Sequence, residues 1–400
     1  MAKPKLNLVA VGDVHPNRED PRTLFRLVAD VLKQGDITCC QLECTISDKG
    51  TVRTDVRNPT HRVPAKNIEA LVAGGFSLVT FAGNNNLDYG LNAFFDTLEC
   101  LDKVGIRTVG AGKNLEEARR PVVLERNGVR VAFVNACSIL RDGYEATPHR
   151  PGIAPLRVRT FYEPLENIYE QPGTPARTWT VADVDDLEEV CNTIRAAKRE
   201  AHVVVASFHW GIHFTYDLAM YQPDVAYAAI DAGADLVLGT HPHCLQAIDV
   251  YKGKAIFYSL SNFAFEMPEG AAKVGVGQYL SFYGIPLDRE VPTHPHPSHC
   301  RCAIILKVRM SEEGVERVAF VPTLFNLQAL PEIQKPGTPG YNEIKALIEG
   351  LSNPLGTIIV EENGELVVQP EKRQVVDTRR LLLHRRISYP SLRELATEPV

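Results

Sequence analysis

Side chains of the kinds that bind divalent metal ions recur at five places along this sequence, each just after a short apolar segment. They are Asp13, His15, Glu43, Asn84, His209, His241 and His243. Two divalent ions held close together require oxygen and imidazole donors, a carboxylate that bridges them, and open positions for water. In an extended segment residues i and i+2 point the same way, so Asp13 pairs with His15, and His241 pairs with His243. This recurrence, more than any single pair, predicts a two-metal hydrolytic site.

The apolar segments before these side chains alternate with segments of helical periodicity. Buried strands are predicted at residues 6–11, 37–42, 76–81, 202–208 and 235–238. Helices are predicted at residues 23–32, 67–73, 91–101, 183–198 and 225–232. This alternation indicates an α/β fold. Because functional side chains gather beyond the carboxyl ends of strands in such sheets, we expect residues distant in sequence to converge there.

Other segments predict antiparallel strands, and therefore mixed sheets. Residues 122–125 and 129–134 flank Asn127-Gly128, a dipeptide that favours the positive φ angles of a tight hairpin. Later elements are predicted as a strand pair at 303–308 and 315–321, a helix near 342–351, and a hairpin through Asn363-Gly364.

One large domain is expected over residues 1–330, with residues 331–400 as a C-terminal extension packed on the same core. Within the domain, residues 143–176 are rich in Pro, Gly and Arg and show weak periodicity. Long segments of this kind often cover a functional site, so we interpret this one as a surface insertion that serves as a lid or substrate wall.

Composition narrows the partners and the compartment. The net charge of −6 and pI near 6.1 provide no basic field for a nucleic-acid backbone. No apolar run approaches the ~18 residues of a membrane span, and the N-terminus lacks the apolar core of a signal peptide. The nine cysteines are odd in number and scattered, which predicts reduced thiols. We therefore expect a cytoplasmic protein without nucleic-acid or membrane partners; whether it forms a homo-oligomer stays open.

The motifs together resemble those of a known superfamily. They are Gly12-Asp13-Val14-His15, Gln41-Leu42-Glu43, Gly83-Asn84-Asn85, Leu87-Asp88-Tyr89-Gly90, His209-Trp210-Gly211, Asp231-Ala-Gly-Ala-Asp235, Gly239-Thr-His-Pro-His243 and Ile256-Phe-Tyr-Ser-Leu-Ser-Asn-Phe263. This order is similar to the calcineurin-like metallophosphoesterases, and more closely to the CapA (PGA_cap) family of poly-γ-glutamate capsule proteins, over roughly residues 5–265. The resemblance implies a four-layer α/β/β/α sandwich with mixed sheets.

The resemblance also implies a set of metal ligands. Asp13, His15 and His243 would hold one divalent ion, and Asn84, His209 and His241 would hold the other. Glu43 would bridge the two ions, a place that most of the superfamily fills with Asp. The ions, of manganese, iron or zinc, would activate a shared hydroxide and polarise the bond to be cleaved.

Three positions depart from the pattern of the relatives. Asn85 stands where the superfamily usually has a His that contacts the substrate, and a neutral amide cannot act as a general acid. Ile212-His213 stands where many CapA relatives carry Glu, so His213 is a candidate for the displaced acid or base; an ordinary surface or core histidine is the alternative. Ser261 replaces a Gly before Asn262-Phe263, which alters local backbone freedom.

Two further features leave alternatives open. Arg62 lies where the family has Phe-Arg, and its planar fork would bind an anionic substrate group or form an ordinary salt bridge. Residues 293–302 contain three His and two Cys, which suits an independent zinc site, a loop bordering the active site, or a solvated loop.

The predicted activity is metal-dependent hydrolysis of an amide, a γ-glutamyl bond or a related bond in a small-molecule or peptide-like anionic substrate. A cytosolic phosphodiesterase or phosphatase is one alternative. A non-catalytic accessory protein of polyglutamate capsule synthesis is the other.

Overall fold

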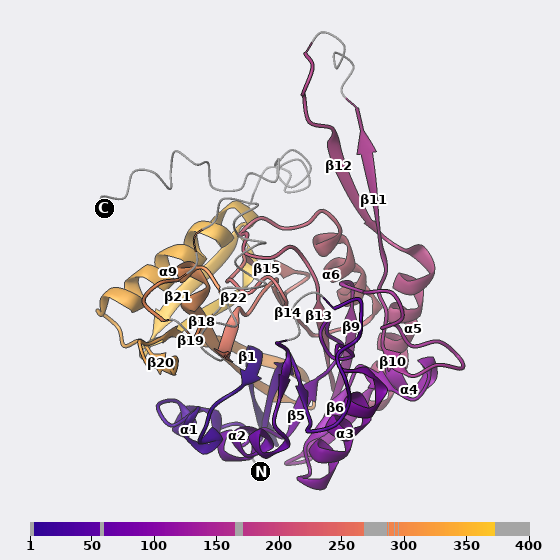
Figure 1. Cartoon of the computed structure of the whole chain (residues 1–400). Coiled ribbons are helices and arrows are strands. Elements are labelled where there is room, and N and C mark those ends of the chain that lie inside the picture. The colour runs from indigo at the N-terminus through magenta and orange to yellow at the C-terminus, as the bar shows by residue number, and fades with distance from the viewer. Residues whose placement is uncertain are drawn as a thin grey trace.

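Two β-sheets lie at the centre of the molecule (Figure 1). The computed structural model describes residues 4–56, 60–164, 171–267, 286, 288–291, 293–294 and 296–372. The larger sheet has ten strands, in the order β21 (Thr357–Glu362), β22 (Glu365–Lys372), β19 (Gly314–Phe325), β18 (Cys302–Ser311), β1 (Lys5–Pro16), β2 (Ile37–Leu42), β5 (Leu78–Thr80) and β6 (Arg107–Val109), with β17 (Asn262–Glu266) beside β1 and β20 (Pro331–Ile333) beside β19.

The smaller sheet has six strands, in the order β15 (Ile248–Tyr251), β16 (Lys254–Phe257), β14 (Leu236–Thr240), β13 (Val203–His209), β9 (Val129–Cys137) and β8 (Val122–Arg126). Its inner strands run parallel, whereas β8 and β15 pair antiparallel at the edges. In the larger sheet, β1, β2, β5, β6 and β17 are parallel and β18 to β22 are antiparallel. The prediction of mixed sheets is therefore confirmed.

Alternation along the strands places apolar side chains of the described residues in separate cores on the two faces of each sheet. Leu8 of β1 and Val205 of β13 lie in the core between the sheets, whereas their neighbours Val9 and Val204 face outward. Val9 packs with helices α2 (Ile68–Gly74) and α3 (Gly90–Lys103), and Val204 packs with α5 (Val184–Glu200) and α6 (Tyr221–Ala232). Helices thus cover the outer face of each sheet, which is the predicted four-layer α/β/β/α arrangement (Figure 1).

The C-terminal part of the described chain joins the same core. Helix α9 (Pro339–Ser352) places Tyr341, Ile344 and Ile348 among the buried residues between the sheets. The hairpin β21–β22 turns at Asn363-Gly364, as predicted, and β22 pairs with β19. Residues 373–400 of the expected extension lie outside the described residues.

Two predicted segments differ from the structure. A continuous helix was predicted over residues 23–32, but residues 21–32 form a 3-10 turn (Pro21–Thr23), further turns and one short helix, α1 (Ala29–Leu32). The apolar stripe is nevertheless used, because Leu24, Phe25 and Val28 are buried. The backbone hydrogen bonds of the intervening residues span three positions, the tighter pattern of a 3-10 helix.

The described parts of the segment at residues 143–176 contain buried residues and strands, although the sequence showed only weak periodicity there. Its first part is buried through Tyr144 and Ile153, and β10 (Gly152–Ile153) pairs with β7 (Ala111–Gly112). The chain then forms a hairpin of β11 (Val158–Glu163) and β12 (Arg177–Ala182), which projects from the body of the molecule (Figure 1). Its function as a lid remains a prediction.

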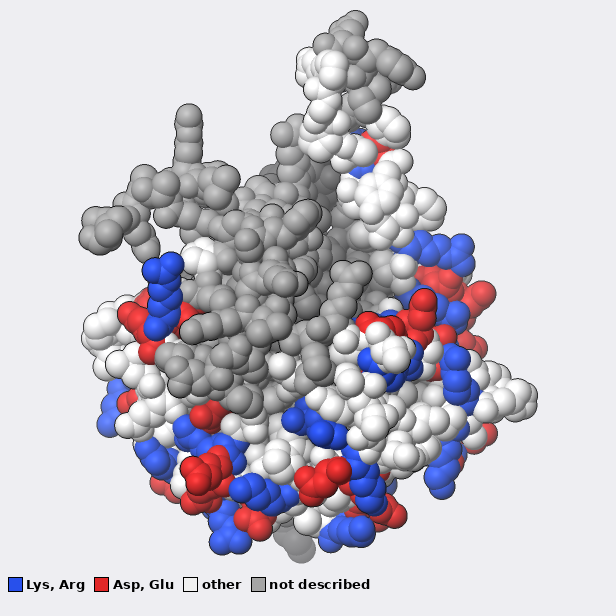
Figure 2. Space-filling view, in the orientation of Figure 1, with Lys and Arg blue, Asp and Glu red and all other residues white. Residues whose placement is uncertain are grey.

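The remaining elements are short. They are β3 (Thr45–Ile46), β4 (Arg62–Val63), α4 (Leu115–Arg119), and single 3-10 turns at Ala65–Asn67, Ser298–Arg301 and Asn353–Leu355. Among the described residues, no helix is long and apolar enough to span a membrane. Figure 2 shows Lys and Arg interspersed with Asp and Glu over the coloured part of one face, without a broad basic field there.

Candidate metal centre

The predicted ligands come from the carboxyl ends of strands in both sheets. Asp13 lies in the last part of β1, Glu43 follows β2, and His209 is the final residue of β13. Asn84 follows β5 by four residues, and His241 directly follows β14. These side chains are at most 7% exposed. The parallel order of the strands brings them to one edge of the sandwich, as the sequence predicted.

A close backbone contact fixes Asp13 at this edge. The Asp13 amide donates to the carbonyl oxygen of Ser261 (2.9 Å), and a Cβ on Gly12 would lie 1.9 Å from the same oxygen. Only glycine therefore fits at position 12 without displacing the backbone. Asp13 Oδ2 accepts a hydrogen bond from the amide of His241 (3.1 Å), which ties the end of β1 to the end of β14.

The backbone is strained at three positions beside Asp13. His241 and His243 have φ angles of 94° and 61°, and Ser261 has a φ of 66°. Residues with side chains hold such left-handed conformations at a cost of about 1–3 kcal/mol each, when surrounding contacts enforce them. Ser261 Oγ donates to the carbonyl oxygen of His243 (3.1 Å), which joins two of the strained positions.

Three ligand-type atoms converge around the Nε2 atom of His209. Asn84 Oδ1 lies 2.8 Å from it, His241 Nδ1 3.1 Å, and Glu43 Oε1 3.6 Å. The other nitrogen, Nδ1, lies 3.0 Å from Thr240 Oγ1. Atoms bound to one ion at ~2.0–2.2 Å lie ~3–3.5 Å apart, so these separations suit a single divalent ion. We call His209, Asn84, His241 and Glu43 the His209 cluster.

Two buried carboxylate oxygens at the site have no hydrogen-bond partner among the described residues, Asp13 Oδ1 and Glu43 Oε2. Burial raises the pKa of Asp13 to about 8. Burial, and then the charge of Asp13, raise the pKa of Glu43 well above its ordinary value. Removing carboxylates from water without a partner is costly, and a bound cation offsets that cost. The donor set therefore fits divalent metal ions.

His213 joins the site from the loop after β13. Its ring centroid lies 4.1 Å from that of His241 and 5.1 Å from that of His243. One nitrogen from each of these three rings lies within 4.8 Å of the others, a second group able to hold a metal ion. Burial, and then the charge of Arg141, lower the pKa of His213 to about 4, so the ring is neutral at pH 7. A neutral imidazole accepts a proton or binds metal.

Asn85 has a definite partner at the site. Its Nδ2 donates to Glu43 Oε1 (2.9 Å), and its side chain is buried. The amide that replaces the usual histidine thus holds the orientation of the predicted bridging carboxylate.

Two predicted site residues make other contacts. The His15 ring nitrogens lie 2.9 Å from the carbonyl oxygen of Glu266 and 3.2 Å from that of Thr60, and the ring is in neither metal-binding group of the described residues. The Arg62 guanidinium donates to the carbonyl oxygens of Lys49 and Gly50 (3.2 and 3.1 Å) and stacks on Tyr89. For His15 to bind an ion, or Arg62 an anion, these contacts would have to be exchanged.

The loop at residues 293–302 borders the site, which selects one of the three alternatives left open by the sequence. The ring of His296 stacks on His243, with centroids 4.4 Å apart and planes at 18°. Asn262 links the two rings, because its Oδ1 lies 2.8 Å from His243 Nδ1 and its Nδ2 lies 3.0 Å from His296 Nδ1. No sequence pattern indicates a role for Asn262, and the density of histidines at residues 293–302 is the only such signal for His296.

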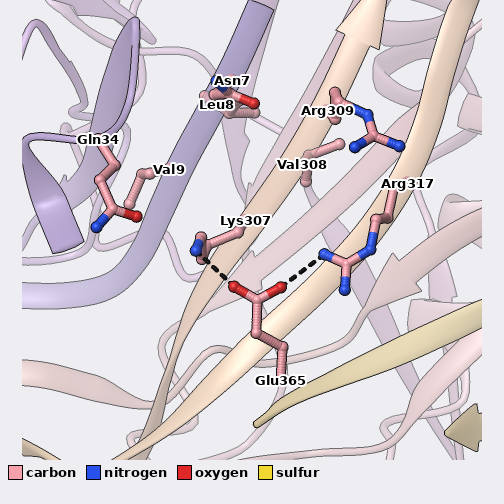
Figure 3. Close-up of a pocket in the computed structure, with 9 residues that line it drawn as sticks. All are labelled: Asn7, Leu8, Val9, Gln34, Lys307, Val308, Arg309, Arg317 and Glu365. Atoms are coloured by element: carbon pink, nitrogen blue, oxygen red, sulfur yellow. Dashed lines mark hydrogen bonds and ion pairs between the residues drawn. The ribbon is translucent and has the colours of Figure 1, made fainter. Parts of the chain in front are cut away.

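A separate cavity of about 400 Å³ lies on the larger sheet, away from these residues. Figure 3 shows Lys307 and Arg317 pointing toward Glu365, to which both donate hydrogen bonds. Lys307 and Arg317 are already paired with the Glu365 carboxylate, so they are less available to bind a ligand than the donor atoms of the His209 cluster.

The fold and the clustered donors define a metallophosphoesterase-like α/β protein. The chain belongs to the family described as "Bacterial capsule synthesis protein PGA_cap", which matches residues 7–267.

Curated relatives carry names from capsule synthesis. The chain is 30% identical to "Capsule biosynthesis protein CapA" of Bacillus anthracis, over 66% of this chain and 60% of that protein. It is 27% identical to "PGA biosynthesis protein CapA" of Bacillus subtilis, over 61% and 57% respectively. It is 29% identical to a "Probable polyglutamine synthesis accessory protein" of Mycobacterium tuberculosis, over 56% and 54%. The chain thus spans less than two thirds of the length of these relatives.

Solved structures show more distant similarity. A hypothetical protein from Thermus thermophilus aligns with a TM-score of 0.43 and 14% identity, over 79% of this chain and 98% of that one. A putative 5'-nucleotidase from Staphylococcus aureus aligns with a TM-score of 0.39 and 13% identity, over 86% and 58%. The fold assignment therefore rests on the layers and strand order described above.

Proposed function

We propose that this protein is a metal-dependent hydrolase that cleaves an amide or γ-glutamyl bond in a small anionic substrate. The observation that carries the proposal is the convergence of Asn84 Oδ1, His241 Nδ1 and Glu43 Oε1 on His209 Nε2. Each of these atoms can offer a lone pair to a cation, and so close a set of buried acceptors suits a bound ion.

Neighbouring residues would hold the ligands in place. Thr240 orients His209, Asn85 orients Glu43, and Asn262 orients His243 through hydrogen bonds of 2.8–3.0 Å. Such second contacts fix the tautomer and direction of each ligand. The metal ions, when bound, would supply a hydrolytic nucleophile at neutral pH and polarise the scissile bond. Manganese, iron and zinc are all compatible with this mixed donor set.

The choice of an amide substrate rests on the proton-transfer groups. Asn85 donates to Glu43 and cannot protonate a leaving group. His213 lies beside His241, with ring centroids 4.1 Å apart, so its ring would be placed to pass a proton from the attacking water to the departing amine. The names of two relatives refer to the biosynthesis of PGA and of polyglutamine, and polymers of glutamate or glutamine consist of amide-linked units. These points favour γ-glutamyl amides over phosphate esters.

Metal analysis of the purified protein, with parallel assays of an aryl phosphate, an aryl phosphodiester and a γ-glutamyl amide, tests the proposal. We expect bound metal and turnover of the γ-glutamyl amide. Absence of both after reconstitution with manganese, iron and zinc would refute it. Faster turnover of either phosphate substrate would instead assign a phosphodiesterase or phosphatase.

Two variants test the roles of individual residues. His241→Ala should lose at least one ion per chain, because His241 belongs to both groups of possible ligands. His213→Ala should lose turnover and keep its metal if His213 transfers protons. Loss of metal from His213→Ala would make it a ligand instead.

An accessory role in polymer synthesis is the second candidate, and the names of the relatives favour it. It predicts that the metal-loaded protein turns over none of the three substrates. In that case the His209 cluster would have a structural function.

A further inference from the structure

The loop that contains Arg141 begins beside the metal cluster. Cys137, the last residue of β9, is paired with His209 in the smaller sheet. The amide of Ser138 then donates to the carbonyl oxygen of His209 (2.9 Å). Arg141 follows three residues later, so its backbone starts from the edge of the sheet that carries the predicted ligands.

Buried contacts hold the turn at residues 141–144 in one conformation. The Tyr144 amide donates to the carbonyl oxygen of Arg141 (3.0 Å), and the Tyr144 hydroxyl donates to Asp88 Oδ1 (2.6 Å). Tyr144 is fully buried. From the other side, Arg53 donates to the carbonyl oxygen of Asp142 (2.9 Å) and lies over the Tyr144 ring. The position of Arg141 is therefore preorganised.

The guanidinium of Arg141 has unused hydrogen-bonding capacity. Its ionic contact is with Asp88 Oδ1 at 3.6 Å, beyond hydrogen-bond distance, and Asp88 already accepts the Tyr144 hydroxyl. Among the described residues no hydrogen bond from this guanidinium is found, and 34% of the side chain is exposed. An arginine offers five donors, so most of these are free for a ligand.

Neighbouring arginines are engaged elsewhere. Arg53 forms two hydrogen bonds of 3.0 Å with the carboxylate of Asp55. Arg62 donates to backbone carbonyl oxygens and stacks on Tyr89. Arg141, by contrast, is linked to the site through its ionic partner. The amide of Asp88 donates to the carbonyl oxygen of Asn85 (3.2 Å), and Asn85 Nδ2 donates to Glu43 Oε1 (2.9 Å).

We propose that Arg141 binds an oxyanion group of the substrate, a carboxylate or a phosphate, next to the metal cluster. The inference rests on the proposed function, and it moves the role expected of Arg62 to another arginine. A planar guanidinium with free donors binds two oxygens of one carboxylate or phosphate at once. Because the turn is held rigid, little order has to be gained on binding.

Calorimetric titration with glutarate and with inorganic phosphate tests the proposal, after the metal content of each protein has been measured. Arg141→Gln should bind at least one of these anions about 10–100-fold more weakly than the original protein, a typical loss for a charge-assisted pair. The anion affinity of Arg141→Lys should lie between those of Arg141→Gln and the original protein, because lysine keeps the charge and loses the planar pair of donors. If Arg141→Gln loses affinity for glutarate alone, the substrate group bound by Arg141 is a carboxylate. If it loses affinity for phosphate alone, the group is a phosphate.

Arg150→Gln is the matched control. Arg150 lies in the same segment, is 44% exposed, and is already paired with Glu145 at 2.9 Å. Its replacement should leave anion binding unchanged. Equal anion binding by Arg141→Gln and the original protein, or no binding by the original protein, would overturn the proposal, as would loss of metal from Arg141→Gln. Anion binding that depends on Arg141, without turnover of any substrate, would contradict only the proposed hydrolase activity.

Discussion

Replacing Thr240 with valine tests whether the His209 cluster is built to bind metal. Thr240 Oγ1 lies 3.0 Å from His209 Nδ1 and can accept a hydrogen bond from that nitrogen. When Nδ1 donates to Thr240, the lone pair is left on Nε2, toward Asn84, His241 and Glu43. Valine has nearly the same volume and lacks the acceptor. The strand itself should be preserved, because its backbone hydrogen bonds remain, including that from Trp210 to the Thr240 carbonyl oxygen (3.1 Å).

The expected signature is a loss of metal affinity with little loss of stability. Removing an outer contact to a metal-ligating histidine typically lowers affinity about 10–100-fold, or ~1.4–2.7 kcal/mol. In the metal-free protein the ring can instead carry its proton on Nε2 and donate to Asn84 Oδ1, 2.8 Å away. The free energy of unfolding without metal should therefore change by no more than ~1 kcal/mol.

Metal affinity is measured by competition with a chromophoric chelator, and stability by urea unfolding in excess chelator. Thr323→Val is the matched control, because Thr323 is also a buried strand threonine and its hydroxyl has no partner among the described residues. It should leave metal affinity unchanged. If Thr240→Val binds metal within twofold of the original protein, the orientation of His209 assigned here is wrong.

Three further predictions follow from the same geometry. Without metal, the free energy of unfolding should fall as pH rises from about 6.5 to 8: Asp13 keeps its proton in the folded protein up to its pKa of about 8, whereas an unfolded Asp has already lost it near 3.8. Below pH 6.5 the buried histidines, with pKa values lowered to between about 3 and 4, act in the opposite direction, so urea titrations should show a maximum near 6.5. Asn262→Leu removes the acceptor 2.8 Å from His243 Nδ1 and should weaken metal binding about 10–100-fold by chelator competition; unchanged affinity would exclude His243 as a ligand. Gly12→Ala places a Cβ 1.9 Å from the Ser261 carbonyl oxygen and should lower the free energy of unfolding by ~3 kcal/mol, whereas an unchanged urea midpoint would contradict the close approach described.

Apolar periodicity predicted the α/β class because it reports burial directly, whereas the four-layer arrangement was implied by the resemblance to the metallophosphoesterases. Leu8 and Val9 belong to different cores, so β1 is buried on both faces. A strand buried on both faces has a continuous apolar sequence, and β1 was predicted from such a run. Once the strands are parallel, their carboxyl ends, which carry the predicted ligands, lie at one edge of the sheets. Asn84, His209 and His241 meet for this reason, although up to 157 positions separate them in the chain.

Other aspects of the site depend on packing that leaves no periodic signal. The contact of His296 with His243 brings together a proline-rich loop and a turn after β14. Arg62 lies in the short strand β4 and Arg141 in the loop after β9, and their contacts differ because their neighbours differ. Backbone carbonyl oxygens accept hydrogen bonds from Arg62, whereas Arg141 lies beside a carboxylate that already accepts the Tyr144 hydroxyl. Such partners are set by tertiary structure, which single-sequence patterns do not encode.

The replacement of the usual histidine by Asn85 changes more than the supply of protons. A histidine there would bring another titratable ring beside Glu43, whereas the amide donates one neutral hydrogen bond to Glu43 Oε1 at 2.9 Å. This bond stabilises the ionised carboxylate without adding charge. In the proposed reaction, moving a proton would fall to His213, whose ring centroid lies 4.1 Å from that of His241. An amide needs a proton on its leaving nitrogen more than an activated phosphate ester does, so an uncharged ring that first takes a proton and then returns it suits the former.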